Sequence, residues 1–169
     1  MDEFLNKFFL QGGIGYAMIG AAASVSFGCM GSARGIRIAA AQAAGVMSEK
    51  PELFGKFLVL MALPGTQGFY SLICSILIAS WSGLMSGTVT LHPAVGIGYM
   101  AVGIGTGIVE WWSAVYQGET SAAAINLVGK QPDAGGRAIL LPALVETYAL
   151  VGLLGAIVLM LFLKSVTIG

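Results

Sequence analysis

The stretch LLPALVETYALVG, residues 140–152, decides the class of fold, because it is an apolar run with a single glutamate near its middle. It belongs to a longer charge-poor run, 138–163, and a helix of about 20 apolar residues crosses the hydrocarbon core of a bilayer. An unpaired carboxylate at the centre of such a helix costs about 3 kcal/mol on insertion scales. We therefore expect Glu146 to be kept for a function or to have well-matched partners.

The composition of the whole chain indicates an integral membrane protein. Of its 169 residues, 57% are hydrophobic and only 9% are charged, whereas soluble domains carry about 25% charged residues. The net charge is zero and gives no indication of a nucleic-acid partner. The first residues, MDEFLNKFF, lack the basic leader and cleavage site of a signal peptide, so we expect none. Cys29 and Cys74 lie in apolar stretches and are expected to pack as small hydrophobic side chains.

Four charge-poor runs are long enough to span a membrane, at 8–33, 57–81, 94–118 and 138–163. The third run holds one charge, Glu110, and the fourth holds Glu146. All four are too long and too uniformly apolar for the strands of a membrane β-barrel, which alternate and take about 10 residues. The sequence therefore predicts an all-α membrane protein with four transmembrane helices.

The chain contains an internal repeat. The tetrapeptide GIGY occurs at 13–16 and again 83 residues later, at 96–99. Other pairs at this spacing are Gly20 with Gly103, Gly35 with Gly118, and Ala39–Ala41 with Ala122–Ala124. Past the first loop the spacing becomes 81, which aligns KPELFGK at 50–56 with QPDAGGR at 131–137, and Gly65 with Glu146. The sequence predicts a duplicated two-helix hairpin, 1–83 and 84–169, in which only the second copy carries the glutamate.

The basic residues predict how the chain is oriented. Six of the eight Lys and Arg flank the two hairpin loops: Arg34, Arg37, Lys50, Lys56, Lys130 and Arg137. The connection at 82–93 has none. By the positive-inside rule, the two basic loops of this multi-pass protein lie on the cytoplasmic side of the cell membrane and both termini lie on the other side. The Ala-rich segments 34–46 and 119–129 predict that the first and third helices continue beyond the bilayer.

The first and third predicted helices are rich in glycine. Small residues at helical spacing let two helix backbones approach closely in lipid. One arrangement consistent with this is tight packing within a single four-helix bundle. The other is a homo-oligomeric double ring, with the first and third helices inside and the second and fourth outside. The repeat favours the ring, because near-identical hairpins can tile head to tail around an axis.

The second span contains a polar face in LPGTQGFY, residues 63–70. Leu63, Thr66, Gln67 and Tyr70 are spaced to share one side of a helix. Pro64 has no N–H, which leaves the Leu60 carbonyl without its usual partner and predicts a kink. The Thr and Gln side chains could begin a cation site, or they could only form hydrogen bonds with neighbouring helices.

Gln117, near the end of the third span, adds a further amide to this set. Together Glu146, Gln117, Gln67 and Thr66 offer one negative charge and several neutral oxygens, the ligands that a hard cation prefers. A monovalent ion would leave the site neutral, whereas a divalent ion would leave excess positive charge. A proton needs only the carboxylate, so the surplus of oxygens favours Na⁺.

At these residues the chain resembles the rotor-ring proteolipid (the c or K type) of V-type sodium-pumping rotary ATPases. The likeness runs nearly end to end. It rests on the duplicated hairpin, LPGTQGFY at 63–70, QG at 117–118 and VETYA at 145–149.

The resemblance implies a function and a set of ion ligands. The ligands of the transported Na⁺ would be the Glu146 carboxylate, the Gln117 and Gln67 side chains, the Thr66 hydroxyl and the Leu63 carbonyl, with Tyr70 hydrogen-bonded to Glu146. The subunit itself would catalyse nothing. A ring of copies in the lipid would be turned by an ATP-hydrolysing head through a central stalk. A stator subunit bearing an arginine would loosen each glutamate in turn.

Rival interpretations share the same glutamate. The nearest is a ring that carries protons, and a different class is a small four-helix cation or drug exchanger. A purely structural membrane scaffold leaves Glu146 unexplained. Glu110 lies seven residues before Gln117, on the same helix face. We expect Glu110 to be solvated in the ring interior or at an interface, the alternative being a second polar site that faces the pore.

Overall fold

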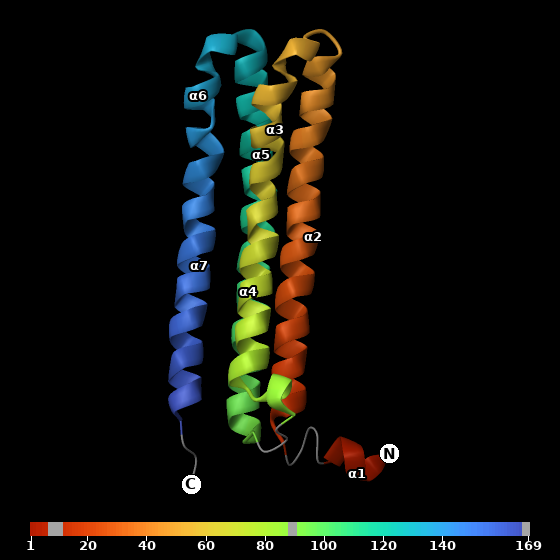
Figure 1. Ribbon diagram of the computed structural model, residues 1–169, viewed down its shortest axis with the longest axis vertical. Helices are drawn as coiled ribbons and strands as arrows, with labels where there is room; N and C mark the ends of the chain where they lie inside the picture. The colour runs from red at the N-terminus through yellow and green to blue at the C-terminus, as the bar shows by residue number, and fades with distance from the viewer. Residues whose placement is uncertain (7–11, 88–90, 167–169) are drawn as a thin grey trace.

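The computed structural model describes residues 1–6, 12–87 and 91–166, and it consists of helices and short connections (Figure 1). The helices are α1 (Asp2–Leu5), α2 (Ile14–Met47), α3 (Phe54–Ala62), α4 (Thr66–Trp81), α5 (Pro93–Lys130), α6 (Gly135–Ala138) and α7 (Leu140–Ser165). By length and composition, four helical segments could cross a membrane, namely Ile14–Met47, Pro51–Trp81, Pro93–Lys130 and Pro132–Ser165. The prediction of an all-α protein with four spans is therefore confirmed.

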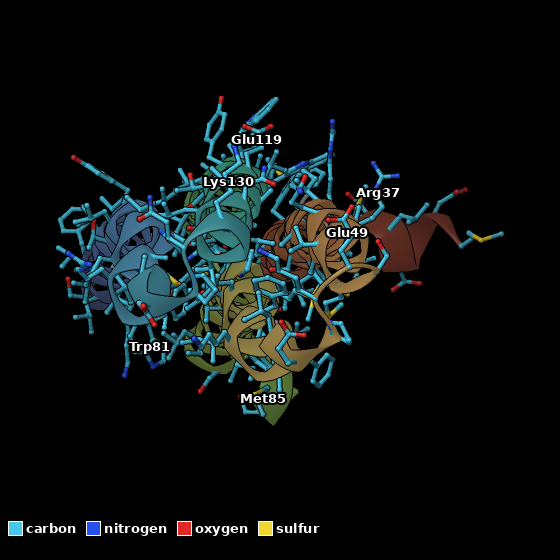
Figure 2. All side chains as sticks on the ribbon, turned by 90° about the horizontal axis from the view of Figure 1, so that it is seen from above. Arg37, Glu49, Trp81, Met85, Glu119 and Lys130 are labelled. Atoms are coloured by element: carbon cyan, nitrogen blue, oxygen red, sulfur yellow. The ribbon has the colours of Figure 1, made fainter. Side chains whose placement is uncertain are left out.

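The four spans run side by side as two hairpins (Figure 1). The start of α2 and the end of α7 lie at one end of the bundle, and the loops that follow α2 and α5 lie at the other. Seen along its length, the bundle has α2 and α7 on opposite sides, with α4 and α5 between them (Figure 2). Helix α5 packs against α2, α4 and α7, and α4 also packs against α7, so both helices join the two hairpins.

Helices α2 and α5 are longer than a bilayer core requires. They have 34 and 38 residues, which at about 1.5 Å per residue is roughly 50 Å or more. The hydrocarbon core is about 30 Å thick. Both helices therefore extend beyond the lipid at one end or both, as their Ala-rich segments predicted.

The glycines related by the internal repeat meet in space. A Cβ added to Gly96 would overlap the backbone of Gly13, one added to Gly103 would overlap Gly20, and one added to Gly118 would overlap Gly35. At Gly20 the added atom would lie 2.6 Å from the Tyr99 carbonyl oxygen and from Met100 Cα. The prediction of close backbone packing is thus confirmed, and equivalent positions of the two copies form the contact between α2 and α5.

The second span changes its helical pattern at Pro64. Helix α3 ends at Ala62, a 3₁₀ turn covers Leu63–Gly65, and α4 begins at Thr66. The sequence predicted a kink here because proline has no N–H to donate. In the structure the 3₁₀ turn accommodates the missing N–H of Pro64. The Pro64 ring is buried against α2, where a Cβ added to Gly35 would lie 2.7 Å from Pro64 Cβ.

A polar layer separates two apolar cores. The core near the loops contains Ala39, Phe57, Leu60, Ile125 and Val128, and the core near the termini contains Ala17, Cys74, Ile78, Tyr99 and Met160. Between them lie the buried polar side chains of Ser32, Gln67, Ser71, Glu110, Ser113 and Gln117. Buried polar groups are costly unless they are hydrogen-bonded, so this layer is where a function is expected.

Candidate ion-binding site

Glu146 lies on α7, partly buried, and faces α4 and α5. The Tyr70 hydroxyl donates a hydrogen bond of 2.7 Å to Glu146 Oε1. The Gln117 amide nitrogen lies 3.4 Å from Glu146 Oε2 and donates to it. The carboxylate is therefore held by one hydroxyl from α4 and one amide from α5.

Gln117 links the glutamate to the rest of the network. Its side chain is fully buried, and its Nε2 also donates to the Pro142 carbonyl oxygen at 3.1 Å. Its Oε1 accepts a hydrogen bond of 2.5 Å from Gln67 Nε2. Both ends of this amide are therefore satisfied, and its orientation is determined by α4 and α7 together.

The 3₁₀ turn supplies the remaining oxygens. Thr66 Oγ1 donates to the Leu63 carbonyl at 3.0 Å and lies 3.4 Å from Gln67 Oε1. Gln67 is fully buried, and its Nε2 is also 3.4 Å from Ser113 Oγ on α5. Because Pro64 interrupts the regular helix, backbone carbonyls of this segment are available to side chains.

All six residues predicted for the site therefore belong to one hydrogen-bonded cluster: Leu63, Thr66, Gln67, Tyr70, Gln117 and Glu146. The predicted hydrogen bond from Tyr70 to Glu146 is confirmed. Thr147, the residue after Glu146, is exposed, and its hydroxyl donates to the Leu144 carbonyl, outside the cluster.

Sequence reasoning missed Ser113, whose hydroxyl accepts from Gln67. The signal was present, because Ser113 lies four residues before Gln117 and so shares its face of α5. A serine in a membrane helix commonly bonds to its own backbone, which is why its sequence position alone did not single it out.

The expectation for Glu110 was wrong. Its side chain is 0% exposed and lies inside the chain, beside Gly152 of α7. It is therefore neither solvated in a ring interior nor placed on a surface that faces a pore. The prediction failed because a helical spacing gives the face of the residue, but the helices covering that face come from tertiary packing.

The first hairpin has no equivalent of this site. At the position of Glu146 it has Gly65, near which the closest atom to an added Cβ is Ile36 Cδ1 at 3.4 Å. At the position of Gln117 it has Arg34, which is exposed. Within the described ranges, the chain therefore carries one such cluster, formed between the two hairpins, with Gln117 and Glu146 supplied by the second.

The chemistry of the cluster is that of a carboxylate surrounded by neutral oxygens and amide groups. Among the described residues, no group of three or more His, Cys, Asp and Glu comes together as a metal cluster would. Soft metals prefer thiolates and imidazoles, whereas Na⁺ takes oxygen ligands. The arrangement fits a monovalent hard cation or a proton.

The fold and the cluster define a multi-pass membrane protein with a hydrogen-bonded carboxylate in a buried polar layer. Comparison with protein families identifies a family of this class. The model of the C subunit of ATP synthase matches the chain twice, over residues 19–78 and 100–159. The chain belongs to this family.

Two curated relatives are similar over most of the chain. The V-type sodium ATPase subunit K of Enterococcus hirae is 31% identical over 161 residues, which cover 95% of this chain and 98% of the relative. The A-type ATP synthase subunit K of Methanocaldococcus jannaschii is 36% identical over 144 residues, 85% of this chain and 63% of the relative. The twofold family match confirms the duplication, with one match in each predicted half; the boundary at 83–84 stays a prediction.

Proposed function

We propose that this chain is the membrane rotor-ring subunit of a V-type ATPase and that it carries Na⁺ across the cell membrane. The observation that carries the proposal is the cluster around Glu146, in which one carboxylate meets hydroxyl and amide groups from three helices. The name of the Enterococcus hirae relative, a V-type sodium ATPase subunit, supports Na⁺ as the ion.

The proposed ligands are the Glu146 carboxylate, the side-chain oxygens of Gln117, Gln67 and Thr66, and the Leu63 carbonyl. Three of these oxygens already lie near one another, with Thr66 Oγ1 at 3.0 Å from Leu63 O and 3.4 Å from Gln67 Oε1. Tyr70 holds Glu146 from the other side of the carboxylate. One carboxylate and one Na⁺ make a neutral assembly, which a membrane interior tolerates.

Binding of Na⁺ would reorient the side-chain amide of Gln117. Its nitrogen now faces Glu146 and its oxygen accepts from Gln67. A cation beside the carboxylate repels amide hydrogens and attracts amide oxygens, so the Gln117 amide would turn over to present Oε1. The same turn would release the hydrogen bond from Gln67 and free that side chain to orient its own oxygen.

The charge of the site couples ion binding to rotation. With Na⁺ bound, Glu146 is neutralised and can pass along lipid. Without it, the bare carboxylate is stable only beside water or a cation, such as the arginine of a stator subunit. Moving one charge across the membrane involves about 2.3 kcal/mol per 100 mV, which an ATP-hydrolysing head would supply through a central stalk.

The rest of the machine would consist of further copies and partner subunits. The chain would form a homo-oligomeric double ring, with α2 and α5 in the inner layer and α4 and α7 in the outer layer. The glycine contacts between α2 and α5 support this, because small residues suit the crowded inside of a ring. The basic loops would lie in the cytoplasm and both termini outside it. The subunit itself would catalyse no reaction.

Carbodiimide labelling of the purified ring tests the ion. Carbodiimides react with a protonated carboxyl group, so at a mildly acidic pH Glu146 should be labelled in the absence of Na⁺ and protected when millimolar Na⁺ displaces the proton. Labelling is read by mass spectrometry at the level of the residue. Labelling that ignores Na⁺ and follows pH alone would instead support a proton ring. A particle that runs in detergent as a dimer rather than a very large complex would support the exchanger.

Replacing Tyr70 by phenylalanine is expected to weaken Na⁺ binding. A hydrogen bond to a charged group contributes about 1.5–3 kcal/mol, so the dissociation constant should rise about 10- to 150-fold. Tyr148→Phe is the matched control, because the Tyr148 ring is 75% exposed two residues from Glu146. Equal affinities for the two variants would show that the bond from Tyr70 does not orient the carboxylate.

A further inference from the structure

A second carboxyl group lies inside the membrane-spanning part of the chain and has no role in the Glu146 cluster. Glu110 is near the middle of α5 and its side chain is 0% exposed. Within the described part of the chain, neither of its carboxylate oxygens has a hydrogen-bond partner. This contrasts with Glu146, whose two oxygens both accept hydrogen bonds.

The surroundings of Glu110 offer it space but no donor. A Cβ added to Gly152 of α7 would lie 3.8 Å from Glu110 Oε1, so this carboxyl group faces a position without a side chain. The hydroxyl one turn before it, on Thr106, donates to the Val102 carbonyl at 2.8 Å. The hydroxyl after it, on Ser113, contacts Gln67. Neither hydroxyl donates a hydrogen bond to Glu110.

The titratable groups around Glu110 are acidic or neutral. Helix α4 contributes the Tyr70 hydroxyl and the Cys74 thiol. Helix α7 places Gly152 beside Glu110, and α2 places Phe27 against Trp111 at this level while its Cys29 is exposed. No described element presents a basic side chain there.

The described basic side chains do not compensate Glu110. Arg34 of α2 is three residues from Gly31, whose added Cβ would meet Trp111, but Arg34 is exposed. Arg37, Lys50, Lys56, Lys130 and Arg137 flank the two hairpin loops. Lys164 lies in the last turn of α7, over the Trp81 ring. Because Glu110 has no exposed surface, a neighbouring copy cannot reach it either. An ionised Glu110 would be a buried, unpaired charge, so it must take up a mobile cation.

A proton fits this position and Na⁺ does not. Na⁺ would require several oxygens around the carboxylate, as the Glu146 cluster provides. A proton needs only the carboxylate itself. A groove of about 380 Å³ between α5 and α7 is lined by Thr106 and Val109 on one side and Gly152 on the other, and so reaches the immediate neighbours of Glu110. Protons could enter by this groove.

We propose that Glu110 is a second cation-binding site that holds a resident proton. Its side chain is then a neutral carboxylic acid, located on α5 on the N-terminal side of the transport site. The site lies on the same face of α5 as Gln117 and two turns away from it, and it is independent of which ion Glu146 carries. It keeps the polar layer uncharged at the contact of α4, α5 and α7.

Infrared spectroscopy of the assembled ring tests the proposal. In the Na⁺-saturated ring the cation at Glu146 takes the place of a proton, and the exposed carboxylates are solvated by water. We expect the carbonyl band of one protonated carboxyl per chain to remain. It should vanish in Glu110→Gln and persist in Glu119→Gln, an exposed position on the same helix. Absence of the band from the wild-type ring would overturn the proposal, even if Glu110→Gln failed to assemble.

Equilibrium binding of radioactive sodium gives an independent result. Glutamine mimics a neutral acid, so Glu110→Gln should keep the wild-type number of Na⁺ per chain and an affinity within about twofold. A fall in that number would make Glu110 a sodium site and refute the resident proton. If Glu146 carried a proton instead of Na⁺, two protonated bands would be seen and only one would vanish in Glu110→Gln. Failure of the proposed function is thereby distinguished from failure of this inference.

Discussion

Replacing Glu146 by glutamine is expected to abolish Na⁺ binding and transport while leaving the ring assembled. Two unit charges about 4 Å apart attract by about 4 kcal/mol at an effective dielectric constant near 20. Since about 1.4 kcal/mol corresponds to tenfold in affinity, the dissociation constant should rise about a thousandfold. Glutamine can still accept from Tyr70, so the fold should tolerate the change. Sodium binding to purified ring and sodium uptake by vesicles measure the two losses.

Two controls make this result specific. Glu119→Gln removes an exposed carboxylate from α5 and should leave Na⁺ affinity unchanged. Glu146→Asp keeps the charge but draws it back from Tyr70 and Gln117, so it should bind Na⁺ with an affinity between those of wild type and Glu146→Gln. Sodium binding at wild-type affinity by an assembled Glu146→Gln ring would refute the role given to this residue.

Replacing Gly20 by alanine is expected to prevent assembly. The new methyl group would lie 2.6 Å from both the Tyr99 carbonyl oxygen and Met100 Cα. These are backbone atoms and cannot rotate away, so α2 and α5 would have to separate. Overpacking of a rigid core costs about 1–3 kcal/mol or more, and helix association in lipid depends on such close contacts. We expect the yield of assembled ring, measured by native electrophoresis, to fall about tenfold or more.

The matched control is Gly45→Ala on the same helix. Nothing lies within 4 Å of a Cβ at Gly45, and alanine is the better helix former. This variant should assemble at least as well as wild type. If Gly20→Ala and Gly45→Ala assembled equally, the contact between α2 and α5 would not be what holds the two hairpins together.

The sequence was sufficient for the architecture because its signals are periodic and strong. Apolar runs of membrane length predicted the four spans, and the glycine-rich helices predicted a close backbone approach, which the structure shows between Gly20 and Gly103. The site was predictable for a related reason. Leu63, Thr66, Gln67 and Tyr70 share one helix face, and an isolated Glu146 in an apolar helix requires such partners.

Features that depend on how helices meet could not be predicted. The spacing of Glu110 from Gln117 gave its face but not its burial, nor the approach of α7 at Gly152. Ser113 gained a role only because Gln67 approaches it from another helix. The sequence predicted a kink at Pro64, but it did not predict that the kink takes the form of a 3₁₀ turn at Leu63–Gly65. In each case the sequence determined the chemistry and tertiary packing determined the neighbours.

The most direct test of the central claim is a structure of the assembled ring, determined in Na⁺ at a resolution that shows bound ions. We expect one ion per chain among α4, α5 and α7, coordinated by the Glu146 carboxylate and by oxygens from Gln117, Gln67, Thr66 and Leu63. A map in which Glu146 points into open water, away from Gln67 and Gln117 and with no ion beside it, would refute the proposed sodium site.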